Sequence, residues 1–140
     1  MAATTEGRIL AALMTRAAGL SALGLPIAWP NVDFTPPENQ KYLRVQFVPN
    51  VTQRQWIASD GVHRYLGLLQ VSVFWPKGQY EGELRPREIA GQVAAHFPCD
   101  HQITEDDVTV RVMERPTVAD MLPEDSRVHI PVTIQWECFA

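Results

Sequence analysis

The sequence predicts an α+β domain of two layers, with two helices packed on one face of an antiparallel-rich sheet of four to five strands. Two segments, 5–18 and 86–97, carry apolar residues every three to four positions, which is the spacing of an amphipathic helix. Three others, 42–48, 63–75 and 128–138, alternate apolar with polar residues, as strands with one buried face do. The 140 residues fit a single domain, residues 1–140.

The first helix is expected to end near Ala18. Thr4 and Thr5 precede its apolar stripe, and threonine is a residue type that caps the start of a helix. Gly19 follows the stripe, and glycine commonly ends helices. Two prolines then bracket a short extended piece at 27–29, and the double proline of "VDFTPPENQ" indicates a loop.

Two long strands follow that loop. The first, 42–48, is expected to stop at Pro49, because proline cannot donate to a central ladder. A long connection, 49–62, leads to the longest strand, 63–75. Gly67 lies inside this strand, where glycine indicates either a bulge or the close approach of another group.

The second helix is expected to begin near Pro86, since proline suits the first helical position, and to end at Pro98. Two further strands, 108–113 and 128–138, follow from their alternation. Pro131 stands on the polar phase of the last strand. Because it lacks an N–H group, it predicts an edge position for that strand.

Composition and charge restrict the class of protein. The formal net charge is −4 and the arginines form no basic block, which argues against a protein that coats nucleic acid. Arg8 and Arg16 interrupt the apolar N-terminal run, so neither a secretion signal nor a membrane-spanning helix is expected and the chain is expected to be intracellular. Cys99 and Cys138 are expected to be buried thiols and not a disulfide.

Few residues point to chemistry. The segment "HFPCDH" offers His96, Cys99 and His101 as metal ligands or as a thiol with an imidazole base. No fourth ligand is evident, and a helix exit with a buried thiol and two surface imidazoles is the simpler interpretation. The acidic run 104–107 is typical of a solvated turn. The sequence therefore predicts no catalytic residue, no metal and no cofactor, and an enzyme is not expected.

Two surfaces are candidates for contact with other molecules. The polar faces of the strands predict a wide hydrophilic surface that either lies in solvent or faces a lumen or a polar partner; it comprises Arg44, Gln46, Gln70, Ser72, Thr133 and Gln135. Large residues in the loops either pack back onto the domain or contact a neighbouring subunit or partner; they are Arg54, Trp56, Tyr80, Met121 and Leu122.

Four segments together resemble one protein family. They are "LPIAWPNVDFTPPENQKYLRVQFVPN", "YLGLLQVSVFWPKGQ", "REIAGQVAAHF" and "IPVTIQWEC". In this order they resemble the tail-terminator-like proteins of long-tailed bacteriophages, and the resemblance runs from the first helix to the final strand. The family has no catalytic residues to carry over to this chain.

The resemblance implies a structural protein of the virion tail or neck, assembled in the cytoplasm of the host bacterium. It implies a hexameric ring that caps the tail tube, ends its polymerisation and provides the head–tail joining surface. The implied partners are further copies of the chain, the tail tube protein and the head–tail connector protein. DNA would pass through the ring without specific binding, and no membrane is involved.

In such a ring, the loops 49–62, 76–84 and 116–126 would reach toward neighbouring subunits or the tube. Two alternatives stay open at this point. One is another neck protein, such as a head-completion or connector component. The more distant one is a small metal- or cysteine-dependent enzyme that uses His96, Cys99 and His101.

Overall fold

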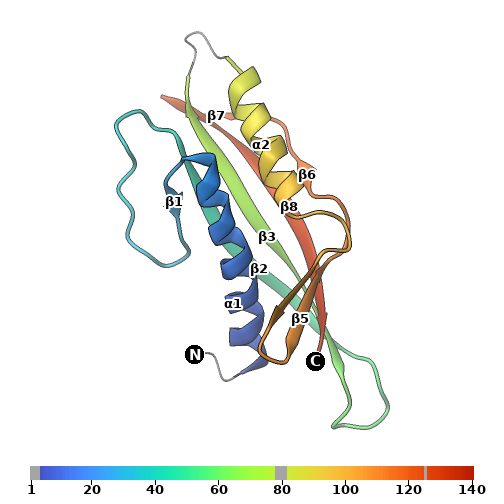
Figure 1. The fold of residues 1–140 in the computed structure, drawn as a ribbon. Coiled ribbons are helices and arrows are strands. Elements are labelled where there is room, and N and C mark those ends of the chain that lie inside the picture. The colour runs from blue at the N-terminus through green and yellow to red at the C-terminus, as the bar shows by residue number, and fades with distance from the viewer. Residues whose placement is uncertain (1–3, 78–81, 125) are drawn as a thin grey trace.

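The computed structural model describes residues 4–77, 82–124 and 126–140. Two helices lie on one face of a long, twisted sheet (Figure 1). The strand order is β1-β2-β3-β8-β5-β4, and β6 and β7 also pair with β8. The elements are α1 (Thr5–Ala18), a 3-10 helix (Gly19–Leu23), β1 (Ile27–Ala28), β2 (Tyr42–Arg54), β3 (His63–Pro76), α2 (Leu84–His96), β4 (Gln102–Glu105), β5 (Val108–Val112), β6 (Thr117–Val118), β7 (Leu122–Pro123) and β8 (Arg127–Phe139).

The α+β class and the two helices on one face agree with the prediction, but the sheet is larger than four to five antiparallel strands. In the described part of the chain it has eight strands, and it is mixed because β1 pairs in parallel with β2. The sequence did not predict β4, which has four residues, or β6 and β7, which have two residues each. Segments this short hold too few residues for an alternation to be recognised.

Helix α1 begins where the sequence predicted. The Thr4 hydroxyl accepts a hydrogen bond from the backbone N–H of Gly7 at 3.1 Å, which satisfies one of the free amides at the helix start. Ile9, Leu13 and Ala17 are buried on one side of the helix. Because they are spaced four residues apart, these side chains lie on one side of α1, and that side packs against the sheet.

Helix α2 begins at Leu84, two residues before the predicted start at Pro86. Pro86 still lies in the first turn, where backbone N–H groups have no partner within the helix, so its missing donor costs nothing there. Ile89 and Val93 bury the side that faces the sheet. The helix ends at His96, before Pro98, as predicted.

The first long strand does not stop at Pro49. β2 continues to Arg54 and pairs with β3 along its whole length, with a register shift between Pro49 and Thr52. Proline is tolerated here because β1 pairs with only the first residues of β2, which leaves an open edge further along the strand. Of the predicted long loop at 49–62, residues 49–54 are therefore the end of β2, and residues 55–62 are the connection to β3.

The last strand does not lie at an edge, although Pro131 predicted one. β8 pairs with β3 on one side and with β5, β6 and β7 on the other. The carbonyl of Pro131 accepts a hydrogen bond from Ala119, just beyond β6. In an extended strand the N and O atoms of one residue point to the same side. The missing N–H of Pro131 therefore faces the gap between β6 and β7, where no donor is needed.

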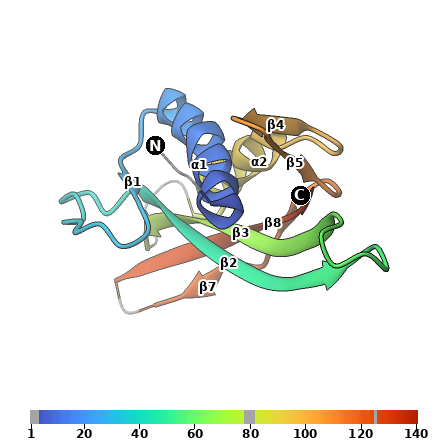
Figure 2. The ribbon, with the colours of Figure 1, turned by 90° about the horizontal axis from the view of Figure 1, so that it is seen from below.

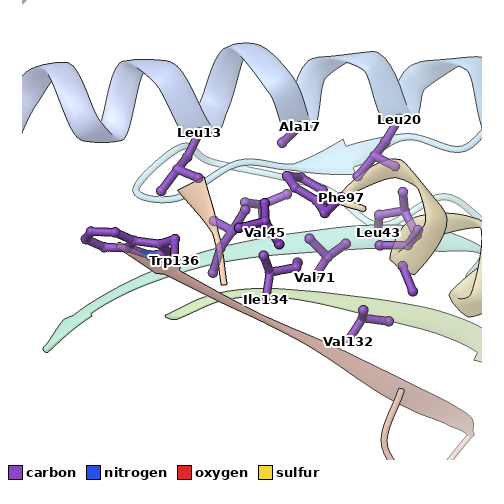
Figure 3. Close-up of a cluster of buried hydrophobic side chains, with 14 of the residues drawn as sticks. Leu13, Ala17, Leu20, Leu43, Val45, Val71, Phe97, Val132, Ile134 and Trp136 are labelled. Carbon is purple, nitrogen blue, oxygen red and sulfur yellow. The ribbon is translucent and has the colours of Figure 1, made fainter. Parts of the chain in front are cut away.

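The core fills the space between the helices and the sheet. Figure 3 shows Leu13, Ala17 and Leu20 pointing from the helical segment toward the sheet, where Val71 and Ile134 lie. Apolar side chains of the helices and of the sheet are buried against each other between the two layers. This burial is the main source of the stability of such a fold. The opposite face of β2, β3 and β8 points away from the helices, and part of it is exposed, as at Gln46.

Candidate functional site

A hairpin arm extends beyond the body of the domain (Figure 1). It consists of the last residues of β2, beyond the register shift, and the first residues of β3 that pair with them. Its tip is residues 55–62. Every residue from 48 to 60 is exposed. Seen from below, the arm extends to one side of the molecule and the loop between β1 and β2 extends to the opposite side (Figure 2). The two projections therefore lie at opposite sides of the domain.

The tip of the hairpin arm presents large apolar side chains to solvent. Trp56 is 61% exposed and Ile57 is 95% exposed, and Val51 and Val62 are exposed nearby. Apolar side chains at the end of a projection do not stabilise the isolated domain, because they stay in water and no apolar surface is buried. Such a group typically marks a contact with another molecule.

The tip is held in a defined shape by Arg54. Its Nε donates a hydrogen bond to the carbonyl of Trp56 at 2.8 Å, and its Nη2 donates to the carbonyl of Ile57. Gly61 closes the turn with an N–H bond to the carbonyl of Ala58 at 3.2 Å. A guanidinium that ties two successive carbonyls reduces the freedom of the loop, so less entropy is lost when the tip binds.

The structure brings only some of the predicted contact residues together. Arg54 and Trp56 share the tip of the arm. Leu122 is 46% exposed on β7, whereas Met121 is half-buried against the core. β7 pairs with the start of β8 and the arm adjoins its end, so these residues lie at opposite ends of the sheet (Figure 1). Tyr80 lies outside the described residues.

The six residues of the predicted polar sheet surface share one face. Arg44 lies opposite Ser72, and Gln46 and Thr133 lie on either side of Gln70 in adjacent strands. Gln135 continues this face in β8. Gln46 is exposed and four of the others are half-buried, while Ser72 is fully buried and its hydroxyl has no hydrogen-bond partner among the described residues.

A cluster of aromatic rings and cations, which the sequence analysis missed, adjoins this polar surface. The Tyr42 and Phe74 rings stack at 4.6 Å, and the His129 ring lies 5.1 Å from Phe74 on the other side. The guanidinium groups of Arg44 and Arg127 lie 5.0 and 4.7 Å from the Phe74 ring, within the range of cation–π attraction. Tyr42, Phe74 and His129 come from three different strands and meet only through the pairing of β2 with β3 and of β3 with β8, so the sequence gives no local signal for this cluster.

Glu124 completes this cluster. Its carboxylate accepts hydrogen bonds from Arg127 at 3.2 Å and from Nδ1 of His129 at 2.7 Å. Burial alone would raise the pKa of Glu124, but the bonds from Arg127 and His129 outweigh it and hold the pKa below its usual value. The Glu124 carboxylate is therefore ionised near neutral pH and anchors the start of β8.

A second ionic network lies near the other end of β8. Glu137 is only 5% exposed. It accepts hydrogen bonds from Arg64 Nε at 2.9 Å and from Arg111 Nε at 2.8 Å. Arg111 also pairs with Asp100. Burial would raise the pKa of Glu137, but the bonds from Arg111 and Arg64 outweigh this and lower it. The network links β3, β8 and β5 at the base of the hairpin arm.

The segment "HFPCDH" serves a structural contact. His96 Nε2 lies 2.7 Å from the carbonyl of Arg16, and the Arg16 guanidinium donates to the carbonyl of His96 at 2.7 and 2.9 Å. These reciprocal bonds join the ends of α1 and α2. Cys99 is exposed, which corrects the prediction of a buried thiol, whereas Cys138 is buried as predicted.

His101 lies near this junction, and its pKa is lowered by burial and then by the positive charges of Arg16 and His96. Among the described residues, no three His, Cys, Asp or Glu side chains are grouped as a metal site requires. Of the acidic run 104–107, the first two residues belong to β4 and the last two form the turn to β5. None of the described helices has the length and apolar content needed to cross a membrane.

Comparison with known proteins gives one family. The family model described as "Phage tail terminator protein" matches residues 8–136. A solved structure, whose name states no function, matches 97% of this chain and 96% of its own, with a TM-score of 0.79 and 27% sequence identity. No curated protein matches the chain. The matched range contains both helices almost entirely, the hairpin arm and most of β8.

Proposed function

This chain belongs to the phage tail terminator family, and we propose that it forms a hexameric ring that caps the tail tube and ends its polymerisation. Membership makes it a structural protein of the phage tail. In the proposed role the free face of the ring also provides the surface to which the head joins. Its partners are other copies of the chain, the tail tube protein and the head–tail connector protein.

The observation that carries this proposal is the hairpin arm with its exposed apolar tip. A ring needs contact surfaces on two different sides of each subunit, because a head-to-tail contact repeats around a closed circle. The arm and the loop before β2 project to opposite sides of the domain (Figure 2). Trp56 and Ile57 are exposed at the end of a projection held by Arg54. These features support assembly with other subunits as the function of the protein.

The polar sheet surface suits a channel wall. Gln46, Gln70 and Thr133 carry no charge at any ordinary pH, and the whole chain has a net charge of −4. DNA phosphates bind to clustered lysine and arginine side chains, which this surface lacks apart from Arg44. We therefore place this face toward the lumen or a polar partner, where DNA passes without specific binding.

The proposal is tested by electron microscopy of particles made by the parent phage with and without this gene. Loss of a terminator gives tails of uncontrolled length that are detached from full heads. A matched control restores the gene on a plasmid and should restore both tail length and joining.

Two other outcomes of that experiment identify a different role. Tails of normal length that fail to join heads would assign the chain to another neck component, such as a head-completion or connector protein. Normal and infectious particles would contradict both assembly roles.

A further inference from the structure

An apolar groove lies on the side of the domain away from the hairpin arm. It has a volume of about 480 Å³. One wall is the stripe Leu10, Met14 and Ala18 of α1, spaced four residues apart, beside the stripe that packs on the sheet. The other wall comes from Trp29 and Val32, in the loop that follows β1. Among the described residues, no charged side chain lines the groove, so its natural occupant is an apolar group.

The tip of the hairpin arm matches this groove in chemistry but cannot reach it within one molecule. Ile57 is 95% exposed and Trp56 is 61% exposed. In both ribbon views, the tip lies away from the loop that carries Val32, and Figure 2 places the two on opposite sides of the domain. One surface that projects and one that is hollow, on opposite sides of one chain, suit a head-to-tail contact between copies.

The charges near the two surfaces include one pair of opposite sign, Asp60 of the tip and Arg44 near the groove. Residues 55–62 of the tip carry one formal charge, which is negative and belongs to Asp60. The loop that forms one wall of the groove also borders a second recess of about 460 Å³, lined by Arg44, Arg127 and Asp33. Arg127 is already paired with Glu124, so Arg44 is the cation of this lining that can attract the Asp60 carboxylate of a neighbouring tip, and Asp33 opposes it. The Arg44 guanidinium lies 5.0 Å from the Phe74 ring, and its Nε is buried without a hydrogen-bond partner among the described residues.

We propose that the hairpin tip of one copy seats in the groove of the next, with Ile57 against Met14. This proposal rests on the ring of the proposed function and names the subunit contact within it. Trp56 and Ile57 are the anchors of that contact, and the tip arrives with its shape already fixed by Arg54. The same contact repeated around the ring leaves no apolar tip in solvent.

Cysteine cross-linking in assembled particles tests the contact. The variant Met14→Cys, Ile57→Cys, Cys99→Ser replaces the exposed native thiol and leaves Cys138 buried. On a non-reducing gel of purified particles, oxidation should give a ladder of covalent oligomers that collapses to the monomer on reduction. The matched control, Leu84→Cys with Ile57→Cys and Cys99→Ser, uses a residue that is 81% exposed but lies outside the groove, and it should give no ladder.

Absence of the ladder from particles that contain the protein would overturn the contact, as would an equal ladder from the Leu84→Cys control. A tip bound to the tube protein instead would cross-link to that protein and not to a second copy. Tail length in the particles is measured separately, so normal tails without the ladder would refute this contact and leave the terminator role intact.

A competition provides the second readout. When equal amounts of the unsubstituted chain and the Ile57→Glu variant are produced together, particles should incorporate at least about 30-fold less of the variant, the loss typical of an anchor residue. Ile57→Leu is the control and should compete nearly equally. Equal incorporation of Ile57→Glu would contradict the role of Ile57 as an anchor.

Discussion

The indole of Trp136 occupies the space that a side chain on Gly67 would need. A Cβ built at Gly67 would lie 2.5 Å from a ring carbon of Trp136 and 2.8 Å from the carbonyl oxygen of Val48. Gly67 and Trp136 are paired across β3 and β8. The Trp136 ring also stacks with Phe47 of β2 at 5.7 Å. Because Gly67 has no side chain, the rings of Phe47 from β2 and Trp136 from β8 can meet over β3, which lies between these strands at the base of the hairpin arm.

Substitution of Gly67 by alanine should therefore destabilise the fold. The added methyl group has to displace an indole and a backbone carbonyl, and overpacking of this kind costs about 1–3 kcal/mol. Urea unfolding followed by circular dichroism measures the change. Gly91→Ala is the matched control, because a Cβ there meets nothing within 4 Å and alanine is favoured within a helix. Equal stability of Gly67→Ala and the unsubstituted chain would contradict the packing described.

The free energy of unfolding should fall in acid partly through Glu137. Its pKa is lowered in the folded state, so the folded protein binds the proton less tightly than the unfolded chain. The stabilisation is fully present above the ordinary glutamate pKa of about 4.3 and is lost as the pH falls through the lower, folded value. Urea unfolding between about pH 6 and pH 3 measures this decline.

The variant Glu137→Gln isolates that contribution. At neutral pH it should lose on the order of 1–2 kcal/mol, less than for a fully buried pair, because Arg64 and Arg111 are partly exposed. Below the folded pKa its stability should approach that of the unsubstituted chain. Parallel stability curves for the two proteins across the whole pH range would contradict the pKa shift.

The two thiols should differ sharply in reactivity. Cys99 is exposed, whereas Cys138 is 1% exposed and burial raises its pKa, which reduces the fraction present as the reactive thiolate. A colourimetric thiol reagent should titrate one equivalent in the native protein and two in denaturant. The variant Cys99→Ser should show almost no native reaction. Rapid reaction of two thiols in the native protein would show that the end of β8 opens.

Loss of the Arg54 side chain should loosen the tip without unfolding the domain. Arg54→Ala removes the bonds to the carbonyls of Trp56 and Ile57, so amide hydrogen exchange in residues 56–62 should accelerate. The free energy of unfolding should change by less than about 0.5 kcal/mol, as for most surface substitutions. Gln55→Ala is the control, because Gln55 makes only a 3.4 Å bond to the carbonyl of Arg54. Unchanged exchange would show that the tip is ordered by other contacts.

The long elements could be predicted from the sequence because each of them repeats a pattern over many residues. The apolar spacing in α1 and the alternation in β8 are signals of this kind, and they also place Gln70 and Thr133 on one face. The close approach expected at Gly67 is confirmed by its contact with Trp136.

The remaining features depend on contacts between distant residues. Pro49 predicted the end of a strand and Pro131 predicted an edge strand. Each proline instead lies where its missing N–H is not needed, and only the pairing of β2 and β8 with their neighbours reveals this. The joining of Glu124 to Arg127 and His129 and the apolar groove by Met14 likewise arise from packing. No local pattern in the sequence encodes such contacts.

The most direct measurement of the central claim is a cryo-electron microscopy reconstruction of the head–tail junction of the parent phage. The account predicts one closed ring of this chain at the head-proximal end of the tail tube, with six copies around the channel. Density for the chain elsewhere in the virion, or no ring at the end of the tube, would contradict it.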